Sequence, residues 1–244
     1  MSIIKASNKN IRADVIEYVK NLKKKNPNAT IIDVGGYGNP WLDEYVDAYV
    51  DVVNVNTTKK VFIGDINLNN TWNELSKEDK FDFSICTHTL EDIRCPEVAL
   101  EGLQKISKAG FIAVPNKHTE FSHIESSYFV GYAHHRWIFT LQNNELRMIG
   151  KFPLSNYFSN RNGLILFLSK FPFIRRIYCK ALRIKPTPGL PYLSWFEKKL
   201  AKHSYELGFI WEDSFKSSFI NNDFTGFSSI ELGKLYSEQL AAGL

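Results

Sequence analysis

Short β-branched runs alternate with helix-like stretches over more than a hundred residues, and this alternation limits the possible folds more than any other feature of the chain. The runs expected to be strands cover residues 30–34, 49–55, 60–64, 81–86 and 111–114. Apolar residues at helical spacing predict helices over residues 10–25 and 96–107, with a short helix at 41–45. Strands that alternate with helices form a mostly parallel sheet with helices on its faces. The sequence therefore predicts an α/β fold with a core over residues 1–140 and an accessory region over residues 141–244 packed on it.

Composition supports a globular protein. The chain has 244 residues, of which 44% are hydrophobic, so it can bury one sizeable core and is not disordered. Its three cysteines form no CxxC pair, which argues against a disulfide framework or a thiolate zinc site. The N-terminus has no apolar signal region, and no apolar stretch reaches the roughly 18 residues of a spanning helix. We expect a cytoplasmic protein that at most contacts a membrane surface.

A cluster of glycines follows the first predicted strand, at Gly35, Gly36 and Gly38. In an open parallel sheet, ligands bind beyond the carboxyl ends of the strands, so this loop lies in the ligand position. Glycines let the backbone approach a ligand closely and present N–H groups to an anion. The third glycine of a dinucleotide fingerprint is replaced by Trp41, and no phosphate-binding G-K-[ST] follows, which disfavours both of these sites.

Three segments resemble class I S-adenosylmethionine-dependent methyltransferases. Residues 31–36 (IIDVGG) are similar to the first motif of that family, residues 81–91 followed by Pro96 to its fourth-strand motif, and residues 108–116 to the segment that ends its fifth strand. The three lie in the family's order and cover about residues 30–116. The resemblance is closer to a type 11-like subgroup that has a GGxxNP loop and a downstream His-Arg-Trp element, here residues 135–137. It implies a Rossmann-like class I methyltransferase fold, S-adenosylmethionine as cofactor, and an acceptor from surface-glycan or capsule polysaccharide biosynthesis.

The resemblance also implies a set of cofactor-binding residues. The loop at Asp33, Gly35, Gly36 and Gly38 would meet the methionine part, although the family's glycines stand one residue out of step here. The ribose hydroxyls would be held either by Asp51 or by Asn56, and the carboxylate is the better acceptor. The adenine and the sulfonium would be contacted by four further residues, which are Asp65, Ile66, Thr87 and His88. From spacing alone, Asp65 is equally suited to a turn.

Histidines supply the candidate catalytic groups, since five of the six fall within residues 88–135. A hydroxyl acceptor must lose a proton, and histidine titrates near neutral pH. The candidate bases are His88, His135 and His118, and Glu91 could orient one of them. The predicted substrate-binding residues are Asn116, Glu120, His134, Arg136 and Trp137. No metal is expected, although His118, Glu120, His123 and His135 could form a divalent site, because no known ligand spacing is present.

Positive charge is concentrated in one late segment. Residues 170–202 carry nine Lys or Arg and one Glu, while the whole chain sums to only +4. Residues 164–185, which overlap this segment, could be a helix packed on the core with a solvated basic face or an interfacial segment on anionic lipid or a lipid-linked acceptor. They could also be a lid whose Arg175, Arg176 and Lys180 bind the phosphates of a nucleotide-activated or phosphorylated acceptor. No motif that reads a nucleic-acid groove is present, so nucleic acid is not an expected partner. We also expect a pair of short strands and a helix within residues 145–169.

The sequence thus predicts a methyltransferase that modifies a small molecule, with a hydroxyl, phosphate or amine as acceptor group. Two alternatives remain open at this point. The irregular glycine loop is compatible with a methyltransferase-fold protein that has lost catalysis and acts as a scaffold. The histidine cluster is compatible with a metal-dependent hydrolase.

Overall fold

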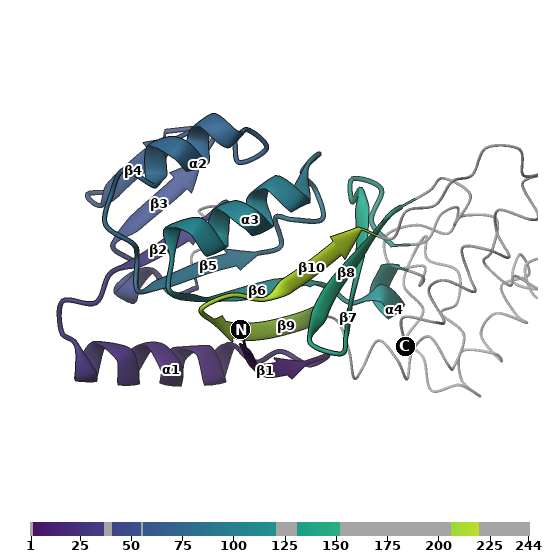
Figure 1. Cartoon of the computed structure of the whole chain (residues 1–244), viewed down its shortest axis with the longest axis horizontal. Coiled ribbons are helices and arrows are strands. Elements are labelled where there is room, and N and C mark those ends of the chain that lie inside the picture. The colour runs from purple at the N-terminus through teal and green to yellow at the C-terminus, as the bar shows by residue number, and fades with distance from the viewer. Residues whose placement is uncertain (1, 37–40, 55, 121–130, 152–205, 220–244) are drawn as a thin grey trace, which may run out of the picture.

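A seven-stranded sheet forms the centre of the molecule (Figure 1), and the computed structural model describes residues 2–36, 41–54, 56–120, 131–151 and 206–219. The strands lie in the order β1-β9-β6-β5-β2-β3-β4, and β9 runs antiparallel to both of its neighbours while the other strands are parallel to one another. Their bounds are β1 Ser2–Ser7, β2 Ile31–Val34, β3 Ala48–Asp51, β4 Lys60–Ile63, β5 Phe83–Thr87, β6 Ala109–Pro115 and β9 Glu206–Glu212. This order, with one antiparallel strand near an edge, confirms the predicted Rossmann-like methyltransferase fold.

Helices cover both faces of this sheet, as the alternation of elements predicted. Helix α1 (Arg12–Lys25) packs Val15 and Val19 against one face, where Ile31, Phe83 and Phe111 point. Helices α2 (Asn69–Leu75) and α3 (Pro96–Ile106) pack on the opposite face. Neighbouring residues of a strand point to opposite faces, so each central strand is buried on both sides.

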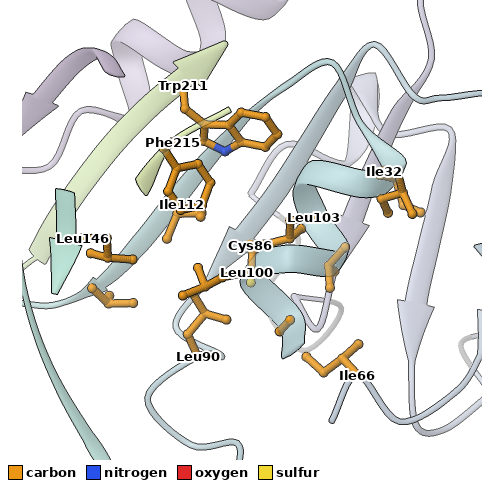
Figure 2. Close-up of a cluster of buried hydrophobic side chains, with 14 of the residues drawn as sticks. Ile32, Ile66, Cys86, Leu90, Leu100, Leu103, Ile112, Leu146, Trp211 and Phe215 are labelled. Atoms are coloured by element: carbon orange, nitrogen blue, oxygen red, sulfur yellow. The ribbon is translucent and has the colours of Figure 1, made fainter. Parts of the chain in front are cut away.

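The larger of the two cores lies on the face covered by α2 and α3 (Figure 2). It brings together side chains from α3 and from the sheet, including its late strand β9, among them Ile32, Cys86, Leu100, Ile112 and Trp211. Helices α2 and α3 can approach each other closely because residue 102 of α3 is a glycine. A Cβ there would overlap the indole of Trp72 in α2. This core holds the strand ends in fixed positions, and the candidate site is built on those ends.

A second, three-stranded sheet extends the same face. Strands β7 (Trp137–Gln142) and β8 (Glu145–Gly150) form a hairpin, and β10 (Lys216–Phe219) pairs in parallel with β8. The hairpin turn is Asn143-Asn144, with φ of 51° and 60°, which suits the two-residue turns that asparagine favours. Of the pair of strands expected within residues 145–169, only β8 is described, and its partner β7 begins earlier, at Trp137.

Several boundaries and elements differ from the sequence prediction. The strand expected over residues 49–55 ends at Asp51, and Val52 and Val53 are 61% and 58% exposed. A 3-10 helix at Asp43–Tyr45 confirms the short helix expected there. Strands β1 and β9 were not anticipated, and β9 enters the main sheet from beyond residue 140. The basic segment 170–202 lies outside the described residues, and no helix in the part that is described has the length and apolarity to cross a membrane.

Candidate functional site

The turn after β2 and the turn after β5 meet at the carboxyl edge of the sheet. Gly35 has φ of 73°, its N–H donates to Val50 O at 2.9 Å, and its carbonyl accepts from Thr89 Oγ1 at 3.2 Å. A Cβ at Gly35 would lie 2.5 Å from Thr89 Cγ2. A side chain is therefore excluded at Gly35 both by the left-handed backbone and by the neighbouring turn.

Asp33 lies directly below this turn and is 2% exposed. Burial raises the pKa of its carboxyl to about 7, and the charge of Asp51 adds to the rise, while the backbone N–H groups of Gly36 and Val34 oppose it. A Cβ at Gly36 would overlap Asp33 Oδ1, and this oxygen has no hydrogen-bond partner among the described residues. The turn thus exposes backbone above a buried carboxyl group.

The other predicted cofactor residues follow the next two strands. Asp51 ends β3 and is half-buried, and its Oδ1 accepts from Val53 N at 3.3 Å. Asp65 follows β4, where its Oδ1 accepts from the N–H of Asn67 at 2.9 Å and from Asn67 Nδ2 at 2.7 Å. Asp65 therefore stabilises a turn, which is the alternative role that its spacing suggested.

The remaining members of the cofactor set differ in how far they are exposed. Ile66 is buried in the core, where its carbonyl accepts from Trp72 Nε1 at 2.9 Å. Asn56, the alternative for the ribose, is exposed. Thr87 is buried at the end of β5, and Gly38 lies outside the described residues. The residues that the fold brings together at the β2–β5 junction are Asp33, Gly35, Gly36, Thr87 and His88.

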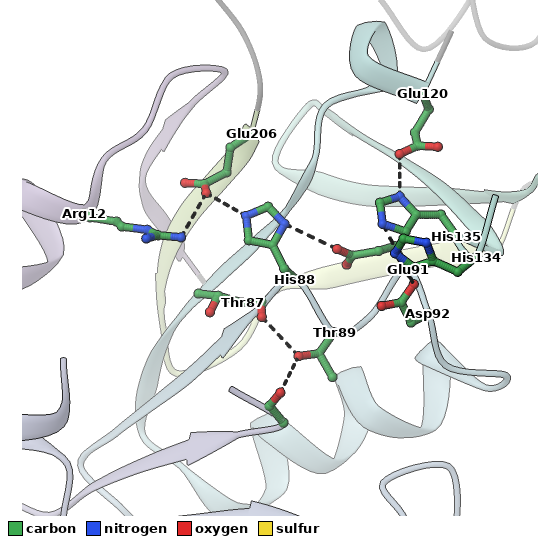
Figure 3. Close-up of polar contacts among 11 residues, drawn as sticks. Arg12, Thr87, His88, Thr89, Glu91, Asp92, Glu120, His134, His135 and Glu206 are labelled. Carbon is green, nitrogen blue, oxygen red and sulfur yellow. Dashed lines mark hydrogen bonds and ion pairs between the residues drawn. The ribbon is translucent and has the colours of Figure 1, made fainter. Parts of the chain in front are cut away.

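His88 lies between two buried glutamates at the end of β5 (Figure 3). Its Nε2 is 2.9 Å from Glu206 Oε2, and its Nδ1 is 3.4 Å from Glu91 Oε1. The hydrogen bond to Glu206 and then the nearby carboxylate of Glu91 raise its pKa to about 9, despite partial burial. His88 has φ of 51°, a conformation that aims its ring between the two carboxylates. At neutral pH the imidazole is therefore protonated, and it must lose that proton before it can act as a base.

Arg12 extends this ion pair toward helix α1. Its Nη2 lies 3.7 Å from Glu206 Oε2, and its guanidinium is 5.1 Å from the centre of the Trp41 ring. Glu206 is 4% exposed, so its charge is balanced by His88 and Arg12 rather than by water. Sequence reasoning missed both Arg12 and Glu206, which come from the first helix and a late strand.

A second buried pair lies at His135. Its Nδ1 is 2.6 Å from Glu120 Oε1, and Glu120 Oε2 accepts from Lys151 Nζ at 2.7 Å. Lys151 also donates to the carbonyl of Tyr132 at 2.7 Å. Glu120 lies in the short helix α4 (Lys117–Glu120) and is fully buried. The predicted residues Glu120 and His135 are thus in direct contact, and Lys151, which the sequence did not single out, bonds the other oxygen of Glu120.

The His-Arg-Trp element fastens the turn after β5. The N–H of Arg136 donates to the carbonyl of Glu91 at 2.6 Å, and the indole N–H of Trp137 donates to the carbonyl of Ile93 at 2.8 Å. The Arg136 side chain is exposed, whereas Trp137 packs edge-on against Phe219. These contacts give Arg136 and Trp137 a positioning role in the described structure.

Three predicted residues remain to be placed. Asn116 is buried at the end of β6, and its Nδ2 donates to Asn8 Oδ1 at 2.8 Å. His134 is exposed and lies beside His135, with ring centres 4.5 Å apart. His118 lies in α4, and its side chain is outside the described part, as is the whole of His123. Of the four-residue metal set considered from sequence, only Glu120 and His135 can be compared, and they are bonded to each other.

Comparisons with known proteins give only distant similarities. No protein-family model matches the sequence, and no curated protein matches it either. The N-terminal domain of EvdMO1 with SAH bound is a solved structure with 13% identity and a TM-score of 0.32, and the match covers 52% of this chain and 57% of that one. The methyltransferase domain of bacterial CtHen1-CN has 12% identity and a TM-score of 0.39, over 83% of this chain and all of that one.

A putative sarcosine dimethylglycine methyltransferase from Galdieria sulphuraria has 11% identity and a TM-score of 0.34, over 86% of this chain and 89% of that one. All three are distant structural similarities to methyltransferases, and the fold assignment rests on the strand order of this chain.

Proposed function

We propose that this protein is an S-adenosylmethionine-dependent methyltransferase that acts on a small molecule. The observation that carries the proposal is the meeting of the Gly35 turn with Thr89, next to His88, at the carboxyl ends of β2 and β5. The chain runs outward from β2 through β3 to β4 and then crosses back to β5, so this junction is where the strand order reverses. Ligands of open α/β sheets bind at such a point.

The residues at this junction fit the proposed cofactor. A sulfonium cofactor with an amino-acid part needs close backbone approach, and side chains are excluded at Gly35 and Gly36. Its positive groups favour nearby carboxylates, and Asp33 holds an oxygen with no partner in the described chain. Asp51 ends the neighbouring strand with its carboxylate partly exposed, where it would accept from two ribose hydroxyls. When bound, the cofactor would supply an electrophilic methyl group.

The acceptor group that we propose is a hydroxyl beside the imidazole of His88. In its protonated state His88 orients an oxygen but cannot take its proton. When His88 has lost its proton to solvent, the neutral imidazole can accept the proton of the acceptor hydroxyl. Glu206 then stabilises the imidazolium that forms. Because the pKa of His88 is raised to about 9, the rate of transfer should rise with pH up to that value. A glycan or capsule precursor as the acceptor rests on the resemblance of the GGxxNP and His-Arg-Trp segments alone.

Isothermal calorimetry with S-adenosylhomocysteine tests the cofactor. We expect the wild type to bind and Asp51→Asn to bind about tenfold or more weakly, because a charged acceptor of hydrogen bonds is lost. Asp79→Asn is the matched control, because Asp79 is exposed and its substitution removes the same charge at a distant position. No binding at millimolar concentration would contradict the proposal and would leave the scaffold alternative.

Transfer of labelled methyl groups tests the acceptor. The wild type is incubated with labelled S-adenosylmethionine and with nucleotide-linked sugars, lipid-linked sugars or RNA as separate substrates. We expect methylated sugar and unmodified RNA, with a rate that rises between pH 6.5 and 9. A preference for RNA, or a rate independent of pH, would contradict the assignment of the acceptor or of His88.

A further inference from the structure

We propose that Asp92, His134 and His135 form a binding site for a divalent transition-metal ion. Each residue offers one ligand atom, and the three atoms lie within 4.8 Å of one another. Asp92 Oδ1 is 3.9 Å from Nε2 of His134 and 3.9 Å from Nε2 of His135. Tetrahedral zinc with bonds of about 2.0–2.2 Å places its ligand atoms about 3.3–3.5 Å apart. Each distance from Asp92 to a histidine therefore has to shorten by about half an ångström, and the distance between the two histidine nitrogens by up to about 1.4 Å.

The hydrogen bond of His135 has the form found behind metal ligands. A histidine that binds a metal through one ring nitrogen almost always donates the other N–H to a carboxylate or carbonyl. Nδ1 of His135 is bonded to Glu120, which leaves Nε2 to face Asp92 (Figure 3). The charge of Glu120 is in turn balanced by Lys151. The hydrogen bonds that would orient His135 as a metal ligand are therefore already present, from His135 to Glu120 and from Lys151 to Glu120.

Two backbone contacts hold the ligand loops against each other. Arg136, next to His135, donates its N–H to the carbonyl of Glu91, and Trp137 donates its indole N–H to the carbonyl of Ile93. Glu91 and Ile93 flank Asp92, so the turn after β5 is fastened on both sides of the carboxylate. The histidine pair and Asp92 thus come from two loops whose relative position is fixed by bonds that do not involve the ligand atoms.

The donors define the class of ion. Two imidazoles and one carboxylate suit Zn²⁺ and related first-row ions, whereas Mg²⁺ and Ca²⁺ prefer oxygen ligands. Three protein ligands leave at least one coordination position for water or another ligand. Asp92 and His134 are exposed, so that position is open to solvent. None of the three ligand residues needs methyl transfer to bind an ion, so metal binding is measured directly rather than through activity.

Cobalt titration provides the test. The full chain, without a histidine tag and stripped with chelator, is titrated with Co²⁺ while its visible absorption is followed, and Zn²⁺ is then added in competition. We expect one Co²⁺ per chain, displacement by Zn²⁺ and none by excess Mg²⁺.

His134→Ala and Asp92→Asn should each weaken Co²⁺ binding by about 100-fold or more, beyond the 10–100-fold typical of residues behind the ligands. Both side chains are exposed, so circular dichroism should show an intact fold. Asp79→Asn removes the same charge elsewhere and should bind as the wild type does. Less than one bound Co²⁺, or unchanged affinity in either ligand variant, would overturn the proposal.

Discussion

The two halves of the sheet's carboxyl edge are built in different ways. Beyond β2, β3 and β4, the site consists of backbone at Gly35 and Gly36 and of carboxylates such as Asp65 that hold turns. Beyond β5, β6 and β9, it consists of buried side-chain charges, in which Glu91, Glu120 and Glu206 face histidine, lysine or arginine. The first half, which we call the glycine half, depends on the shape of the main chain. The second, the histidine half, depends on charges that balance one another away from water.

The largest expected effect is the loss of one buried charge from the histidine half. Glu120→Ala leaves Lys151 and His135 without their shared carboxylate, and breaking a buried pair costs about 3–5 kcal/mol. The control is Glu74→Ala, which removes the carboxylate of the exposed Glu74–Lys77 pair and should cost about 0–1 kcal/mol. Urea unfolding of both variants measures the difference, and equal losses would mean that burial of the charges does not distinguish this half.

A somewhat smaller effect is expected from the glycine half. Gly35→Ala places a side chain at φ of 73° and against Thr89, and left-handed strain together with overpacking should lower the free energy of unfolding by about 2–4 kcal/mol. Gly150→Ala is the matched control, because the nearest atom to its new Cβ would be 3.8 Å away. It should change stability by less than about 1 kcal/mol. A Gly35→Ala protein as stable as this control would show that the turn is not constrained.

The smallest effect should be the pH dependence carried by His88. Its pKa is raised to about 9 in the folded state, so its contribution to stability is fully present below pH 6.5 and is lost as the pH rises through 9. His88→Asn, which tolerates the same positive φ, should remove this loss. The side chain is 42% exposed, so we expect a difference below about 1 kcal/mol. Urea midpoints of both proteins at pH 6.5 and pH 9.5 measure it, and parallel changes would contradict the ion pairs.

The central strands and the glycine turn could be predicted because their signals are local. A run such as residues 31–34 is β-branched apart from Asp33 and is followed at once by glycine, so its burial needs no knowledge of its neighbours. Strand β1 (Ser2–Ser7) is an edge strand of mixed polarity, and only its pairing with β9 makes it a strand. Strand β9 is apolar enough to be buried, but its place beside β6 depends on residues about a hundred positions away.

The candidate site divides in the same way. His88 and His135 were found because they cluster in sequence, and Glu120 because it stands among them. Arg12, Lys151 and Glu206 were missed, since an isolated charged residue reads as a surface residue until its partner is known. Asp92 carries a signal that could have been used, because it directly follows Glu91 in the turn after a central strand.

The pairing of β1 with β9 sets a condition on how this chain folds. Residues 2–7 meet residues 206–212, so the sheet closes only after residue 212 has left the ribosome. Until then the edge of β6 has no partner, and pairing across such a long interval is slow. During this interval the apolar strand β6 is an exposed edge strand, and such edges can pair with other chains and cause aggregation. The edge of β6 is therefore protected only once strand β9 has been synthesised and has paired with it.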